Sequence, residues 1–150
     1  MKQYIGTKII QAEPAYRVDG EVFVKANIVP CGVHTEDGNK VVYPDGYESW
    51  SPKDVFEAAY RETSGMNFGL AIEAAKMGKK IARAGWNGKN QYVELGHDFS
   101  YTAPGDIPVR PVQHLDIDSQ ALVFVGTRGR QVGWLASQAD MLADDWMIVE

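Results

Sequence analysis

The sequence contains a single cysteine, three histidines and no long hydrophobic run. The lone Cys31 excludes a disulfide bond within the chain and fits a reducing compartment. Three scattered histidines and one cysteine give no metal-ligand spacing, so we expect neither a metal ion nor a cofactor. No segment approaches the roughly 20 apolar residues of a membrane span, and the N-terminus lacks a signal-peptide pattern. We therefore expect a soluble, cytoplasmic protein.

Positive charge is also scarce, because 15 lysines and arginines stand against 20 aspartates and glutamates, for a formal net charge of −5. Proteins that follow a nucleic-acid backbone usually present a basic face, since phosphate neutralisation dominates their affinity. Polymeric nucleic acid is therefore not an expected partner. A small ligand with one or two phosphates stays open, because a few local cations or backbone amides can bind it.

Residue patterns for catalysis are missing as well. Cys31 lies near His34, but nothing around the pair resembles a nucleophile signature. Aspartates could supply an acid–base pair, but those in the long polar segment 98–119 lie in an expected loop. Asp144 and Asp145 come just before a strand, where solvated turn residues are common. We therefore expect no catalytic residues and no enzymatic activity.

A basic cluster in GKKIARAGWNGKN contains Lys79, Lys80, Arg83 and Lys89. Its glycines do not have the G-x-x-x-x-G-K-[ST] spacing of a phosphate-binding loop. The simplest interpretation is a solvated positive face at a helix C-terminus, where cations are favoured.

Residues 1–63 are expected to form a small N-terminal module. Strands are predicted over 4–12, ended by Glu13-Pro14, and over 21–29, ended by the next proline. The dipeptides Asp37-Gly38 and Asp45-Gly46 predict the turns of a hairpin or meander.

A helix is predicted over residues 51–62. Ser51 is the expected N-cap, Pro52 suits the first helical position, and Asp54 completes an approximate capping box. An apolar face at helical spacing comprises Val55, Phe56, Ala59 and Tyr60.

Residues 66–150 are expected to form a second domain, after a short polar linker over 62–67. Asn67 can cap a helix and Gly78 can end it. The apolar stripe of this helix comprises Leu70, Ala71, Ala74, Ala75 and Met77. Strands are predicted over 81–84 and 92–95, on either side of a turn at 86–90.

The C-terminal part begins with a segment rich in proline, glycine and aspartate, 98–119, which we expect to be a long loop. A hairpin is predicted over 121–135. Ser137 and Asp140 have capping-box spacing for a short helical turn, and 145–150 is predicted to be a final strand. The whole pattern predicts an α+β fold with mostly antiparallel strands.

Two of the four tryptophans stand beside polar residues: Trp86 precedes Asn87, and Trp134 precedes Leu-Ala-Ser-Gln. An indole offers a flat stacking face and a carboxamide offers paired donors and acceptors, which together suit a nucleobase. Core packing is the alternative, since most tryptophans are at least partly buried. Trp50 and Trp146, each beside a structural boundary, are expected in the core.

The stretch MNFGLAIEAAKMGKKIARAGWNGKNQYVEL and the closing GWLASQADMLADDW resemble a phage family, the second Thoeris anti-defence family. Its pattern is a start Met-Asn-Phe-Gly, an alanine-rich helix, a GKKxARxGWNGK segment and a closing WxASQxDMLAxDW. The resemblance covers about residues 66–150. It implies a non-enzymatic sponge for cyclic ADP-ribose-type signals of bacterial TIR-domain defence proteins and, for some members, for cyclic dinucleotides. It also implies a homotetramer with ligand pockets where subunits meet.

Carried over by motif, the resemblance implies that Trp86 and Trp134 stack on purine rings and that Phe68 helps to wall the pocket. Hydrogen bonds to base edges or riboses would come from Asn87, Ser137, Gln138 and Asp140. From charge alone, we add Arg83 or Lys89 as the cation that neutralises phosphate.

The chain departs from this family in its N-terminal module and in the insertion 98–119, which could reshape or cap the pocket. The first half resembles a small module found in front of various phage proteins. One alternative function is a protein–protein interaction module without a small-molecule ligand, which an exposed apolar patch would favour. An enzyme that degrades the signal is the other.

Overall fold

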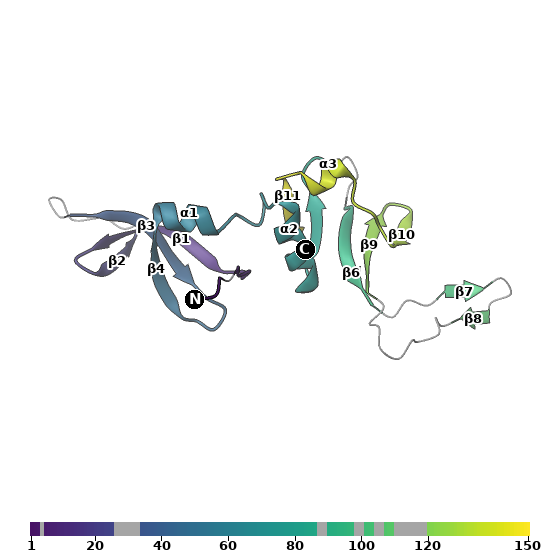
Figure 1. The fold of residues 1–150 in the computed structure, drawn as a ribbon, viewed down its shortest axis with the longest axis horizontal. Helices are drawn as coiled ribbons and strands as arrows, with labels where there is room; N and C mark the ends of the chain where they lie inside the picture. The colour runs from purple at the N-terminus through teal and green to yellow at the C-terminus, as the bar shows by residue number, and fades with distance from the viewer. Residues whose placement is uncertain (4, 26–33, 87–89, 98–100, 104–106, 110–119) are drawn as a thin grey trace. The chain divides into compact units, whose positions relative to one another are not determined.

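The computed structural model describes residues 1–3, 5–25, 34–86, 90–97, 101–103, 107–109 and 120–150, with the backbone alone for 101–103 and 107–109. The chain divides into two compact units, unit 1 (Met1–Arg61) and unit 2 (Glu62–Glu150) (Figure 1). Both are built on antiparallel sheets with short helices, so the predicted α+β fold is confirmed. The helices within these described ranges are all too short or too polar to cross a membrane.

Unit 1 contains one four-stranded antiparallel sheet with strand order β2-β1-β3-β4, followed by α1. The elements are β1 (Gln11–Val18), β2 (Glu21–Val24), β3 (Glu36–Val42), β4 (Glu48–Pro52) and α1 (Lys53–Ala59). Its small core includes Ala15, Val18 and Val41, which are almost fully buried.

The strand predicted over 4–12 is wrong, because β1 begins at Gln11 and runs through Pro14. The Pro14 carbonyl accepts a hydrogen bond from the backbone N–H of Lys25, on the side of β2. The nitrogen of Pro14 faces that same side, where β2 has already ended at Val24. A residue with an N–H at this position would return a bond to the Lys25 carbonyl, so the proline ends the pairing with β2. It leaves the bonds of β1 to β3 unaffected and is tolerated inside the strand. Of the strand predicted over 21–29, the structure keeps β2, and residues 26–29 lie outside the described part.

The two Asp-Gly dipeptides have different outcomes. Asp45-Gly46 is confirmed as the turn between β3 and β4, with Gly46 at φ +84° and the Tyr47 N–H donating to Asp45 Oδ1 at 3.0 Å. The turn predicted at Asp37-Gly38 is wrong, because both residues lie within β3.

Gly38 is required for packing rather than for a turn. A Cβ at this position would lie 2.3 Å from the Ser51 carbonyl oxygen and 2.7 Å from Cζ2 of Trp50. The half-buried Trp50 ring is also covered by the Arg17 guanidinium, 4.1 Å from the ring centroid. The glycine thus lets the indole lie directly against the sheet backbone.

The capping box predicted for α1 is wrong. Ser51 is still paired with Asn39 in the sheet, so the helix begins at Lys53 and Pro52 occupies the N-cap without a side-chain cap. The predicted apolar face is only partly used, since Phe56 and Tyr60 are half-buried against each other while Val55 is 54% exposed.

Unit 2 contains a five-stranded antiparallel sheet with strand order β10-β9-β6-β5-β11. The elements are α2 (Phe68–Lys76), β5 (Lys80–Arg83), β6 (Tyr92–Gly96), β9 (Ala121–Gly126), β10 (Gly129–Val132), α3 (Gln138–Met141) and β11 (Trp146–Val149). The predicted strands 81–84 and 92–95, the hairpin and the final strand are confirmed. Helix α2 packs on the sheet beside β5 and β11, as Figure 1 shows. The alanines Ala71, Ala74 and Ala75 let it approach closely, because all three are buried.

Both predicted ends of α2 are confirmed. Asn67 Oδ1 accepts a hydrogen bond from the Leu70 N–H at 3.0 Å, a cap of a type that contributes about 1 kcal/mol. Gly78 follows the helix at φ +80°. Within the predicted stripe, Met77 is the exception, with 46% of its side chain exposed.

The predicted linker 62–67 is wrong at Thr63 and Met66, whose backbones bond to β11 at the edge of the second sheet. Met66 is buried and exchanges two backbone hydrogen bonds with Trp146, at 2.8 and 3.1 Å. The Thr63 carbonyl accepts from the Ile148 N–H at 2.9 Å. This pairing could not be predicted from the polar, glycine-containing sequence, because the hydrogen bonds are made by the backbone.

The segment 98–119 is more ordered than a loop where the structure describes it. β7 (Tyr101–Ala103) and β8 (Ile107–Val109) pair as a two-stranded antiparallel sheet of their own. The prediction of a loop without strands is therefore wrong over these residues, and the rest of the segment lies outside the described part.

We expect Gly38→Ala to destabilise unit 1 by about 1–3 kcal/mol, because the added methyl group overlaps a backbone carbonyl and the Trp50 ring. Hydrogen–deuterium exchange of β3 and β4, together with chemical denaturation, measures the change. Gly6→Ala is the matched control, since a Cβ there meets no atom within 4 Å. Equal protection of the two variants from hydrogen exchange would show that Trp50 can move aside without a loss of stability.

Candidate functional site

Trp86 is held by a tight turn at the end of β5. Its backbone N–H donates to the Arg83 carbonyl at 3.2 Å, which closes the turn over Arg83–Trp86. The turn directs the indole onto the core of unit 2, where Trp86 is half-buried.

Trp134 reaches the same place from β10. Gly133 has φ +79°, a conformation that a side chain would disfavour, and it turns the chain at the end of the strand. The backbone N–H groups of Gly133 and Trp134 both donate to the Leu122 carbonyl, at 3.0 and 2.9 Å. Trp134 is also half-buried and packs against the core.

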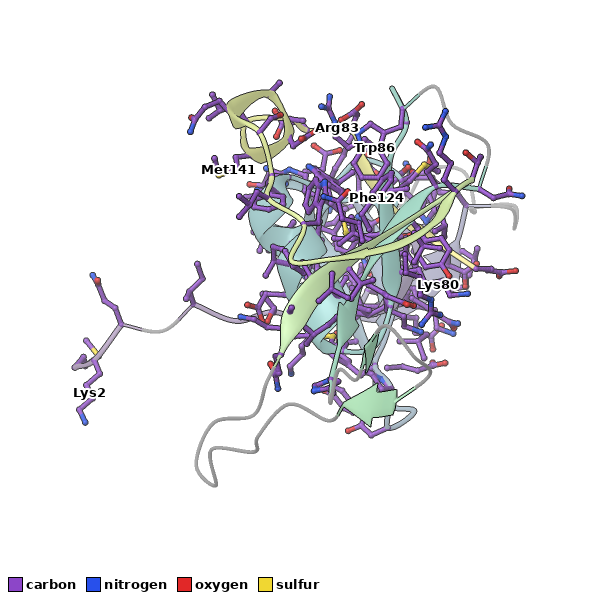
Figure 2. All side chains as sticks on the ribbon, turned by 90° about the vertical axis from the view of Figure 1, so that its right-hand side faces the viewer. Lys2, Lys80, Arg83, Trp86, Phe124 and Met141 are labelled. Carbon is purple, nitrogen blue, oxygen red and sulfur yellow. The ribbon has the colours of Figure 1, made fainter. Side chains whose placement is uncertain are left out.

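Together with Trp146 and Phe124, these residues form the tryptophan cluster. The Trp86 ring centroid lies 6.0 Å from that of Trp134, 5.5 Å from that of Trp146 and 5.5 Å from that of Phe124. Each of these pairs is edge-to-face at 74°, a favourable aromatic geometry. Figure 2 shows Trp86 between Arg83 and Phe124. The prediction that Trp146 is a core residue is confirmed, since it is fully buried.

Phe68, predicted to wall the pocket, lies at the start of α2 and is half-buried. Its ring centroid is 5.4 Å from that of Trp146. The structure thus brings Phe68, Trp86 and Trp134 onto one aromatic cluster, although they are far apart in the sequence.

Arg83 holds the polar side of the cluster through a network that we call the Arg83 clamp, made of Arg83, Asp140 and Asp145. The Arg83 Nε donates to Asp145 Oδ1 at 2.7 Å, and its Nη1 donates to Asp140 Oδ1 at 3.0 Å. The side chains of Arg83 and Asp140 are only 21% and 15% exposed, so solvent screens their ion pair less than a surface pair. Asp145 also accepts a hydrogen bond from the Gly85 N–H at 3.1 Å.

The contacts within the clamp shift the pKa of all three members. The hydrogen bond from Arg83 holds the pKa of Asp145 below its ordinary value of 3.8. Burial raises the pKa of Asp140, but hydrogen bonds from Ser137 and Arg83 outweigh burial and lower it. The two carboxylates in turn raise the pKa of Arg83, Asp145 more than Asp140. Both carboxylates are therefore charged at neutral pH and poorly suited to donate a proton.

The predicted capping box at Ser137 and Asp140 is confirmed. Ser137 Oγ accepts from the Asp140 N–H at 3.2 Å, and Asp140 Oδ2 accepts from the Ser137 N–H at 3.0 Å and from its hydroxyl at 2.7 Å. These side chains bond each other, while Gln138 next to them is exposed. Their predicted contacts with a ligand stay predictions. The predicted site residues Asn87 and Lys89 lie outside the described residues.

Two members of this arrangement were not predicted from the sequence. Asp145 was expected to be a solvated turn residue, but it binds Arg83, which is 62 positions away. Phe124 stands in a strand of the hairpin, and nothing local in the sequence marks it as a neighbour of Trp86. The antiparallel pairing of β5 with β11 and of β6 with β9 brings both residues to the cluster.

Comparison with known proteins concerns mainly unit 2. Residues 66–149 match the model of the Thoeris anti-defense 2-like domain. The chain belongs to this family. It is 35% identical over 91 residues to the Thoeris anti-defense 2 protein of Bacillus phage SP01, an alignment that covers 56% of this chain and 94% of that relative. Membership in this family supports an anti-defence role for the chain, and the tryptophan cluster lies entirely within the matched domain.

We expect acid to destabilise unit 2 through the Arg83 clamp. Because the folded-state pKa values of Asp140 and Asp145 are depressed, both carboxylates stabilise the fold above about pH 4. That contribution is lost as the pH falls through the folded-state values, below 3.8. Denaturant unfolding followed by tryptophan fluorescence, from about pH 6 to about pH 2, measures the loss.

Asp145→Asn is expected to reduce this acid sensitivity, because the amide does not titrate. The exposed neighbour Asp144 provides the control, and Asp144→Asn should retain the wild-type dependence. An Asp145→Asn variant as acid-sensitive as the wild type would contradict the role of the clamp.

Proposed function

We propose that the chain is an anti-defence sponge that sequesters cyclic ADP-ribose-type signals in the cytoplasm of an infected host, without cleaving them. The observation that supports this proposal best is the pair of half-buried tryptophans, Trp86 and Trp134, in the domain that matches the family. Cyclic dinucleotides are the second class of ligand that we propose. The name of the phage SP01 relative supports the anti-defence role.

The angle between the two rings bears on how a base would bind. The planes of Trp86 and Trp134 are inclined at 74°, so one purine cannot lie parallel to both. A purine stacked on one ring meets the other ring edge-on, which is also a favourable contact. A ligand with two bases could use one ring for each.

Stacking supplies only part of the affinity that a sponge requires. A nanomolar Kd corresponds to about −12 kcal/mol. Stacking contributes about 1–3 kcal/mol per base, so two stacked bases reach at most about half of that total. Hydrogen bonds and phosphate contacts must provide the rest, in a site that is already formed before binding.

We propose that the remaining contacts come from the residues around the two rings. Phe68 would wall the site from α2, and the exposed Gln138 would hydrogen-bond the ligand with its carboxamide. Asn87 follows Trp86 directly, and Lys89 would supply positive charge for phosphate.

Capture without cleavage agrees with the chemistry of the described carboxylates nearest the rings. Asp140 and Asp145 are ionised partners of Arg83, and their lowered pKa values make them weak candidates for general acids. This supports a binding protein rather than an enzyme.

Exposed apolar side chains support assembly of several copies. Leu135, next to Trp134, is 88% exposed, and Leu142, directly after α3, is 79% exposed. Exposed apolar side chains of this size are candidates for a protein interface. We propose that they are covered in a homotetramer. The same leucines favour the alternative function, an interaction module that binds another protein and no small molecule.

We expect Trp134→Ala and Trp86→Ala each to weaken ligand binding by about 5- to 150-fold, which corresponds to the loss of one stacking contact. The measurement is a thermal-shift screen with cyclic ADP-ribose isomers and cyclic dinucleotides, followed by calorimetric titration. At a ligand concentration of about 100 Kd, binding stabilises the wild type by about 2.7 kcal/mol, which a thermal shift detects readily.

Tyr47→Ala is the matched control, because it removes an exposed aromatic ring from unit 1. Heating the complex should release the ligand unchanged in mass and chromatographic retention. A wild-type protein whose melting temperature responds to none of these ligands would contradict the sponge and favour the interaction module. An altered ligand after incubation would instead indicate an enzyme.

A further inference from the structure

Arg83 connects the turn that carries Trp86 to helix α3, which follows Trp134 in the sequence. It is the last residue of β5, and its carbonyl closes the turn that holds Trp86. Its guanidinium reaches Asp140 and the Ala139 carbonyl, both in α3, a helix that begins four positions after Trp134. A planar guanidinium can make these contacts at once, because its donors have fixed directions.

Asp145 also binds the turn that carries Trp86, through both its carboxylate and its backbone carbonyl. Its carboxylate accepts from Arg83 Nε at 2.7 Å and from the Gly85 N–H at 3.1 Å, while its backbone carbonyl accepts from the Ala84 N–H at 3.0 Å. Three successive residues before Trp86 are therefore bonded to one aspartate. The turn has little freedom to move the indole.

We infer that Arg83 is a positioning residue, which fixes Trp86 relative to Trp134 by clamping the Arg83–Trp86 turn to Asp145 and to α3. This inference rests on the proposed function for its consequence in binding, but the placement of the ring can be measured without a ligand. It differs from a phosphate contact, because both carboxylates already engage the guanidinium. One arginine between two aspartates leaves the clamp with a net charge of −1, which does not attract a phosphate.

Two variants separate positioning from phosphate binding. Arg83→Lys keeps the positive charge but loses the planar fork that spans Asp140 and Asp145. Asp145→Asn keeps the shape and an oxygen for the Gly85 N–H, but removes the charge that holds Arg83. A phosphate contact would tolerate the first change and gain from the second, since the guanidinium would be freed. A positioning residue is impaired by both.

The ligand-free measurement is the near-ultraviolet circular dichroism of the tryptophans, with acrylamide quenching of their fluorescence. Both variants should change the spectrum and increase quenching, while Asp144→Asn, an exposed neighbour that loses the same charge, should match the wild type. The spectral change caused by Asp145→Asn should vanish in a Trp86→Phe background. Its persistence there, or a wild-type spectrum in both variants, would overturn the inference.

The binding measurement uses cyclic ADP-ribose as the probe. In metal sites, removing a residue that only orients a ligating side chain typically weakens metal binding by about 10- to 100-fold. Because Arg83 is proposed to orient Trp86 in the same way, we expect both variants to bind cyclic ADP-ribose about 10- to 100-fold more weakly. Tighter binding by Asp145→Asn would overturn positioning in favour of a phosphate contact. If the wild type does not bind the probe, the proposed function is at fault and the spectra still decide the inference. If Arg83→Lys does not fold, as judged by far-ultraviolet circular dichroism, Asp145→Asn alone decides.

Discussion

The burial of Trp146 is the constraint on which the rest of unit 2 depends. The side chain is fully buried, and its indole N–H donates to the Asp140 carbonyl at 2.9 Å, so the ring is packed without an unpaired donor. Its backbone pairs with Met66 at one edge of the sheet and aligns with Arg83 on the other side. One residue near the C-terminus thereby joins the start of the domain, the neighbouring strand β5 and helix α3.

The candidate site is an extension of that core rather than a separate structure. Trp86 and Trp134 both lie edge-to-face against Trp146, at 5.5 and 6.2 Å between ring centroids, and each remains half-buried. The rings proposed to bind a ligand therefore also cover the core. This dual use pre-organises them, since packing removes rotamer freedom before any ligand arrives. It also means that function and stability are coupled at both positions, so variants there must be judged by fold as well as by binding.

Features set by neighbouring residues were predicted well from the sequence. Features set by pairing between distant segments were not. The Asn67 cap, the Gly78 helix end and the Ser137–Asp140 capping box are determined by residues within three or four positions of one another. The turn predicted at Gly38 and the strand end predicted at Pro14 were wrong, because the surroundings of both residues are set by neighbouring strands of the sheet. For the same reason, the sequence indicated the two site tryptophans but not Asp145, whose partner is 62 positions away.

The charges around the site constrain how an anionic ligand could be held. Arg83 belongs to the turn that carries Trp86, yet two ionised carboxylates engage it. Moving its guanidinium to a phosphate would leave Asp140 and Asp145 without a counter-charge, partly sheltered from water, which is costly. Neutralisation of phosphate therefore has to come from other cations or from backbone N–H groups. In the proposed site, stacking on the tryptophan rings and neutral hydrogen bonds would then contribute affinity for a base and a ribose without the Arg83 guanidinium.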